Sequence, residues 1–150
     1  MSARPASGPL EAGRTLFNSG RYFEAHDVWE EAWLSAAGVP RRLLQGLIQL
    51  AAAFHKASTR GSARGCVHLI DEGLAKLEGI EDAAAGLALR RLRRDVSAFR
   101  ARAAAWKRGE SEAPERRFPR LHAIRPAGAR QAQMRPSRRA STRTTSRRES

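Results

Sequence analysis

Residues 21–33 read Arg21-Tyr-Phe-Glu-Ala-His-Asp-Val-Trp-Glu-Glu-Ala-Trp33, and this stretch decides the fold. On a helical wheel with about 100° between successive residues, its apolar residues gather on one broad face. That face is made of Tyr22, Ala25, Val28, Trp29, Ala32 and Trp33. Glu24, Asp27 and Glu31 lie opposite, as on a solvated helix face. The pattern predicts an amphipathic α-helix that buries its aromatic side against other elements.

The same helical period recurs along the chain, in five segments separated by glycine and proline. We expect helices at about 9–18, 21–36, 40–59, 62–78 and 84–108. In the third segment, Leu43, Leu47, Leu50 and Phe54 form one apolar stripe. The short connections favour antiparallel neighbours, and no stretch alternates apolar and polar residues over the length of a strand. The sequence therefore predicts an all-α protein, a compact bundle of about five antiparallel helices.

Charge is unevenly distributed along the 150 residues, which carry a formal net charge of +13. Residues 116–150 hold 11 arginines and one acidic residue, Glu149, whereas the charges of residues 1–115 nearly balance. The basic segment has few apolar groups, so it buries too little surface to offset its chain entropy. We expect residues 1–110 to form the helical bundle domain and residues 111–150 to form a disordered Arg-rich tail.

The cysteine content and the hydropathy pattern indicate the compartment. The single cysteine, Cys66, rules out an internal disulfide, which suits a reducing environment. The longest uncharged stretch, residues 43–55, is 13 residues long, whereas a membrane-spanning helix needs about 20. Residues 1–9 lack the apolar run of a signal peptide. We therefore expect a cytoplasmic protein without a membrane span.

Polar residues at the margins of the apolar faces mark a candidate site. His26 and Glu30 lie one turn apart in the second segment, beside Tyr22 and Trp33. In the third segment, two glutamines lie one turn apart and a histidine falls at the edge of the apolar stripe. If these two helices pack antiparallel, the polar side chains share a cleft. The candidate ligand-binding residues are Tyr22, His26, Glu30, Trp33, Gln45, Gln49 and His55.

Three blocks of the sequence together are similar to a known family. They are Phe17-Asn-Ser-Gly-Arg-Tyr-Phe-Glu-Ala-His-Asp-Val-Trp-Glu-Glu-Ala-Trp33, Leu44-Gln-Gly-Leu-Ile-Gln-Leu-Ala-Ala-Ala-Phe-His55, and Gly65 with Leu69. Over about residues 16–77, the chain resembles the bacterial family known as domain of unknown function 309. The resemblance implies a small all-α bundle, and it implies no activity.

The favoured interpretation is a cytoplasmic helical binding module, whose cleft holds an unknown small ligand or a partner protein segment. The alternative is a metal-dependent enzyme of the hydrolase type. A histidine and a glutamate one turn apart can coordinate one divalent transition metal ion, with His55 as the third ligand. The catalytic candidates are Glu24 as a base, with His26, Glu30 and His55. A His26–Glu30 hydrogen bond that satisfies both groups is the simpler explanation of the pair.

The basic tail supports a third hypothesis, the association of residues 116–150 with nucleic acid. Clustered arginines attract phosphate groups in a salt-dependent way, whatever the base sequence. Charge runs are also common on surfaces that only face water. The same holds for the fifth helical segment, where Arg90, Arg91, Arg93 and Arg94 largely avoid the apolar stripe and are expected to form a solvated face.

Overall fold

The structure is a computed structural model that describes residues 8–124. This part of the chain forms six helices and no strand, which confirms the predicted all-α bundle. The helices are α1 (Pro9–Asn18), α2 (Tyr22–Leu34), α3 (Gly38–Ser58), α4 (Ala63–Leu77), α5 (Asp82–Ala85) and α6 (Leu89–Lys107). Among these six helices, none has an apolar stretch long enough to cross a lipid bilayer.

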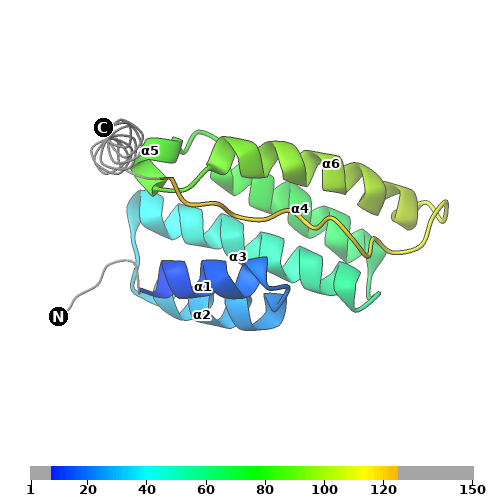
Figure 1. Cartoon of the computed structure of the whole chain (residues 1–150), viewed down its shortest axis with the longest axis horizontal. Coiled ribbons are helices and arrows are strands. Elements are labelled where there is room, and N and C mark those ends of the chain that lie inside the picture. The colour runs from blue at the N-terminus through cyan, green and yellow to red at the C-terminus, as the bar shows by residue number, and fades with distance from the viewer. Residues whose placement is uncertain (1–7, 125–150) are drawn as a thin grey trace, which may run out of the picture.

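Helix α3 is the central element of the bundle (Figure 1). The α1–α2 hairpin packs against one side of α3, α4 packs against the other side, and α6 lies along α4. Two adjacent apolar rows make α3 suitable for this position, because a helix with neighbours on both sides needs a wide apolar surface. One row contains Leu47, Leu50 and Phe54, and the other contains Ile48 and Ala51, all of them buried.

The predicted fifth helix is interrupted near its beginning. The short α5 ends at Gly86, whose φ angle of 72° lies in the left-handed region. Helix α6 then begins at Leu89, where Asp82 Oδ1 accepts hydrogen bonds from the backbone N–H groups of Leu89 and Arg90 at 2.9 and 3.0 Å. This carboxylate satisfies two of the free N–H groups of the first turn of α6. The alanines around position 84 have high helix propensity, so the sequence favoured one continuous helix and did not reveal the break between α5 and α6.

The chain does not leave the bundle after α6, and this moves the expected domain boundary. Residues 111–124, which we expected in the tail, run back along the whole bundle as an extended return segment (Figure 1). Pro114 and Pro119 are buried, and Leu121 is fully buried. Prolines that prevent a helix are compatible with an extended chain on an apolar surface. The remainder of the expected tail, residues 125–150, lies outside the described residues.

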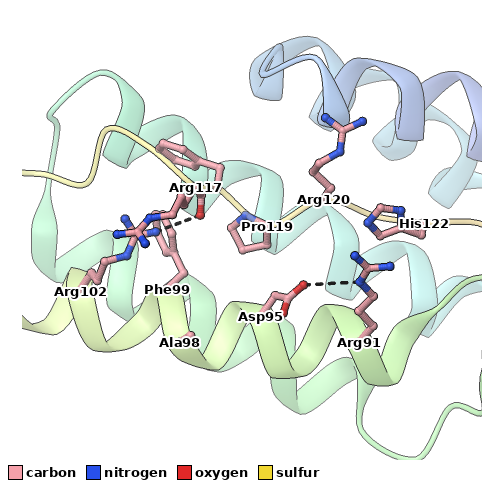
Figure 2. A pocket seen from close by; sticks show the side chains of 10 residues that line it. Arg91, Asp95, Ala98, Phe99, Arg102, Arg117, Pro119, Arg120 and His122 are labelled. Carbon is pink, nitrogen blue, oxygen red and sulfur yellow. Dashed lines mark hydrogen bonds and ion pairs between the residues drawn. The ribbon is translucent and has the colours of Figure 1, made fainter.

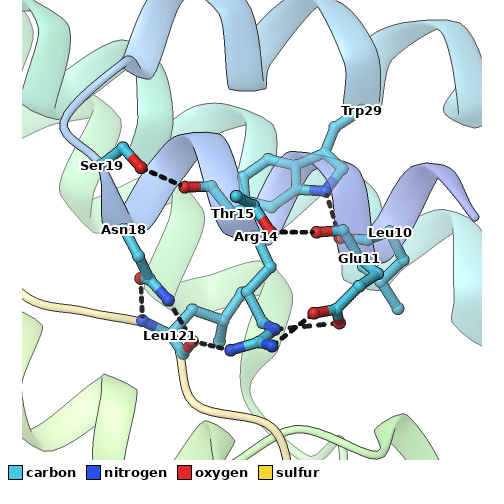
Figure 3. A network of polar contacts seen from close by, with 8 residues as sticks. All are labelled: Leu10, Glu11, Arg14, Thr15, Asn18, Ser19, Trp29 and Leu121. Atoms are coloured by element: carbon cyan, nitrogen blue, oxygen red, sulfur yellow. Dashed lines mark hydrogen bonds and ion pairs between the residues drawn. The ribbon is translucent and has the colours of Figure 1, made fainter. Parts of the chain in front are cut away.

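Side chains of α1 fix the end of the return segment (Figure 3). Asn18 Oδ1 accepts from the backbone N–H of Leu121 at 2.8 Å, and Asn18 Nδ2 donates to the Leu121 carbonyl at 2.9 Å. Arg14 donates to the same carbonyl at 3.1 Å. Beyond this point, Ile124 N–H donates to the carbonyl of Gly86 at 3.1 Å. These bonds satisfy backbone polar groups of Leu121 and Ile124, next to a side chain of Leu121 that is fully buried.

An aromatic cluster joins the distant parts of the chain. The ring of Phe54 in α3 lies 5.7 Å from Phe17, 5.6 Å from Tyr22, 4.8 Å from Phe99 and 5.8 Å from Phe118, measured between centroids. These rings come from α1, α2, α6 and the return segment. Tilted and edge-on pairs at such distances are favourable beyond the burial of their surface.

The α1–α2 crossing depends on a tryptophan that packs against a glycine. Trp29 is fully buried, and its indole Nε1 donates to the carbonyl of Leu10 at 3.2 Å (Figure 3). A Cβ atom added at Gly13 would lie 2.1 Å from that Nε1 atom. The two helices therefore approach each other at a distance that only glycine permits.

We expect Gly13→Ala to lower the free energy of unfolding by about 1–3 kcal/mol, because the methyl group forces the indole out of its packing position. Urea unfolding followed by circular dichroism measures this change. The matched control is Gly61→Ala, where the nearest atom would be 3.6 Å from the new Cβ. Equal stability of the two variants would contradict the packing described for Trp29.

Candidate functional site

Helices α2 and α3 bring His26 and His55 to one small pocket. The pocket has a volume of about 180 Å³ and is lined by Tyr22, Phe23, His26, Ala52, His55 and Lys56. The ring centroids of Phe23 and His55 are 5.6 Å apart, so His55 packs against an aromatic ring. Phe23 itself is 59% exposed. The two histidines therefore share a hollow as the sequence suggested, and aromatic and aliphatic groups make up most of its walls.

The polar neighbours of His26 lie on its own helix. His26 Nδ1 is 3.5 Å from Asp27 Oδ1 and 3.8 Å from Glu30 Oε1. Both separations exceed good hydrogen-bond length, and within residues 8–124 the buried Nδ1 has no hydrogen-bond partner. Ligand atoms of these three residues lie within 4.8 Å of one another. This group of three includes Asp27, which we did not predict, and does not include His55.

The remaining candidate residues lie away from this pocket. Trp33 and Gln45 line a separate hollow at the other end of α2, where the guanidinium carbon of Arg41 lies 3.8 Å from the centroid of the Trp33 ring. Gln49 Nε2 donates to Glu72 Oε1 of α4 at 2.8 Å. The two glutamines therefore lie on the side of α3 that faces α4, and the seven candidates do not line one common cleft.

Three titratable groups near these elements have pKa values shifted away from neutrality. A hydrogen bond from Arg21, with Nε 2.7 Å from Oε1, lowers the pKa of the Glu24 carboxyl. Burial raises the pKa of Tyr22 to about 12 and that of Cys66 to about 11. A general acid or base works best when its pKa lies near the working pH. These shifts therefore do not favour Glu24, Tyr22 or Cys66 for proton transfer near pH 7.

A third hollow, which we call the arginine groove, lies between α6 and the return segment (Figure 2). Its volume is about 470 Å³. It is lined by Arg91, Asp95, Ala98, Phe99, Arg102, Arg117, Phe118, Pro119, Arg120 and His122. In Figure 2, Arg91 and His122 stand at one end, Arg102 and Arg117 at the other, and Arg120 projects from the far side of the return segment.

The groove is held together by one of its own arginines. Arg102 donates to the carbonyls of Arg116 and Arg117 at 2.8 and 2.9 Å. Burial, together with the neighbouring charge of Arg117, lowers the pKa of Arg102. Asp95 is the one carboxylate of the lining, and it is shared between Arg91 at 3.9 Å and Arg94 at 3.7 Å. Positive charge therefore exceeds negative charge within the groove.

His122 responds to this excess of positive charge. Partial burial of the imidazole lowers its pKa, and the charges of Arg91, Arg120 and Arg14 lower it further. Asp95 acts in the opposite direction. The neutral imidazole is thus favoured in the folded protein more than in the unfolded chain.

The fold defines a small helical-bundle domain with an apolar pocket between α2 and α3 and a basic groove between α6 and the return segment. Residues 10–69 match the family model described as domain of unknown function (DUF309). The match confirms the predicted resemblance. It includes the whole apolar pocket, whereas the arginine groove lies outside the matched residues. A comparison with curated proteins found no match.

The shift at His122 makes stability depend on pH. Because the folded-state pKa is lowered, the unfolded chain binds more protons below its own pKa of about 6.5. We therefore expect stability to fall as the pH decreases from about 7.5 to about 5, and we expect a shallower fall in His122→Gln. Urea unfolding across this range measures both slopes.

The matched control for this prediction is His68→Gln, which changes an exposed histidine of α4 that is not part of the groove lining. Identical slopes in the wild type and in His122→Gln would show that the arginines do not act on His122.

Proposed function

We propose that the protein is a helical binding module of the cytoplasm, whose α2–α3 pocket captures a partner polypeptide by one apolar side chain. The observation that carries this proposal is the exposed ring of Phe23 beside a small apolar pocket. An aromatic side chain next to a pocket is typical of the few residues that supply most of the binding energy of an interface.

The size of the pocket favours a side chain over a small-molecule ligand. Its volume of about 180 Å³ is below the roughly 300–1,000 Å³ of most ligand sites. The rings of Tyr22, Phe23 and His55 form its walls together with the methyl group of Ala52 and the side chain of Lys56. A leucine or an aromatic ring that enters this space leaves water and packs against apolar groups.

Lys56 lines the pocket itself, and the exposed acidic residues of α2 outside the lining favour a basic partner. Asp27, Glu30 and Glu31 are exposed on α2. Among residues 8–124, none of these three carboxylates forms an ion pair with a lysine or an arginine. Complementary charge speeds the encounter of two partners and fixes their orientation. The segment captured should therefore carry lysine or arginine next to its apolar anchor.

A peptide library displayed on phage tests this proposal. We expect the selected peptides to place a large apolar residue beside basic residues. Phe23→Ser should weaken the binding of such a peptide about tenfold or more, as fluorescence anisotropy would show. The stability of the protein should change little, because Phe23 is exposed.

Leu34→Ser is the matched control, since Leu34 is 69% exposed at the other end of α2. Peptides without an apolar anchor, or an equal loss of binding in both variants, would overturn the proposal.

A divalent metal ion, in a site of the hydrolase type, is the second candidate function. It is favoured by the three ligand atoms that His26, Asp27 and Glu30 offer within 4.8 Å. Imidazole and carboxylate ligands suit zinc, manganese or iron, and three protein ligands leave room for a reactive water molecule. Such an ion would also give His26 Nδ1 the partner that it lacks among the described residues.

Calorimetric titration of the untagged full chain with zinc tests this second candidate. We expect one ion per chain in the wild type, and an affinity reduced about tenfold or more in His26→Ala. The control is His68→Ala, because His68 forms a similar pair with Glu72 one turn away, at 3.4 Å. The same affinity in both variants would mean that zinc binds elsewhere on the surface.

A further inference from the structure

The arginine groove concentrates positive charge in a hollow that the proposed partner pocket does not use. Four arginines are among its lining residues, and Asp95, the one carboxylate of the lining, is divided between Arg91 and Arg94. Like charges that share a concave surface repel one another, and such a surface raises the local concentration of anions. The chemistry of the lining therefore points to an anionic ligand.

Two arginines at one end of the groove are presented in a fixed way. Arg102 is held by its hydrogen bonds to two carbonyls of the return segment. Arg117 has a φ angle of 53°, in the left-handed region that residues other than glycine rarely adopt. Its side chain has no hydrogen bond or ion pair with any residue of the described part of the chain. Within residues 8–124, Arg117 is thus an unpaired cation on a constrained backbone, next to an arginine that is already positioned.

The length and shape of the groove indicate what kind of anion fits. Arg91 and Arg102 are eleven positions apart on α6, which corresponds to about 16 Å along a helix. In Figure 2 the two arginines stand at opposite ends of the groove, which suits an extended chain of phosphates better than a single phosphate group. Arg91, Arg102 and Arg117 lie along the hollow between α6 and the return segment, whereas Arg120 projects from the far side of that segment (Figure 2). A narrow, flexible polyanion can enter such a space, whereas a flat bilayer surface cannot.

Two phenylalanine rings also line the groove, of which Phe99 is buried and Phe118 is the more accessible. Phe118 is partly exposed and lies beside Arg117 in the return segment. Aromatic rings beside cationic side chains are the usual elements of surfaces that bind single strands, because any base can stack on a ring while arginines contact the phosphates. A duplex keeps its bases stacked inside and offers no free base to this ring.

We propose that the arginine groove binds single-stranded nucleic acid, with Arg91, Arg102 and Arg117 on the phosphates and Phe118 against a base. This site differs from the partner pocket in position, charge and ligand. Residues 125–150 carry eight further arginines and one acidic residue, so the full chain attracts any polyanion to some degree. The test must therefore separate binding in the groove from this general attraction.

The experiment compares two double variants of the full chain that lose the same charge. The groove variant is Arg91→Gln with Arg117→Asn, since asparagine tolerates a left-handed backbone. The control is Arg90→Gln with Arg94→Gln, on α6 outside the groove lining. Binding of a fluorescein-labelled single-stranded oligonucleotide is followed by anisotropy at several salt concentrations, and circular dichroism establishes that both variants are folded.

We expect the groove variant to bind the oligonucleotide about tenfold or more weakly, and the control to bind within about threefold of the wild type. The slope of log K against log salt should decrease by about 0.7 for each phosphate that the variant no longer neutralises. Equal weakening of the two variants would overturn the proposal, because net charge would then account for binding. It would also be overturned if the groove variant lost binding to phosphatidylserine vesicles while keeping its affinity for the oligonucleotide.

His122 provides a readout that general attraction does not affect. Phosphates bound in the groove would offset the positive charge of Arg91 and Arg120, which lower the pKa of His122 in the free protein. NMR titration of the imidazole should show a higher pKa for His122 in the presence of saturating oligonucleotide. An unchanged value at saturation would place the nucleic acid outside the groove and overturn the proposal.

Discussion

The packing of aromatic rings around Phe54 is the interaction on which the rest of the structure depends. Through it, the α1–α2 hairpin, α6 and the return segment all contact the central helix. The two hollows lie on different sides of this cluster and share it as a wall. Tyr22 lines the apolar pocket, Phe118 lines the arginine groove, and their ring centroids are 5.5 Å apart. A change in the aromatic packing therefore reaches both surfaces, although their ligands would differ in chemistry.

Periodicity predicted the helices well because each of them buries one continuous stripe. The prediction was less accurate where structure depends on a single distant contact. The break before α6 is stabilised by one carboxylate, Asp82, which no apolar pattern reveals. The return segment has neither helical nor strand period, so its prolines and arginines indicated disorder. Its position depends on Asn18 and on the surface that α3 and α6 together offer to Phe118.

For the candidate site, the sequence predicted on which face of its own helix each residue lies, but not which other element packs against that face. The positions of His26 and His55 at the margins of their apolar faces correctly predicted that both residues line one pocket. The prediction was wrong for Gln45 and Gln49, which lie on the side of α3 that faces α4, because a helical wheel does not show which neighbouring helix covers each face. Phe23 was visible in the sequence as an aromatic ring outside the apolar face. The helical wheel of α6 placed Arg91 outside the apolar stripe. Arg91 lines a groove because the return segment passes beside α6, and the sequence did not predict this path.

The late position of the return segment also sets the order in which the protein is completed on the ribosome. All six helices are synthesised before Phe118, so a nascent bundle leaves one side of Phe54 and Phe99 uncovered until that residue arrives. Uncovered apolar surface on an incomplete fold is where nascent chains associate with one another. Arg91 and Arg102 border this surface on α6, where their charge repels a second copy in the same state. The same arginines thus act as gatekeepers against aggregation while the chain is still unfinished.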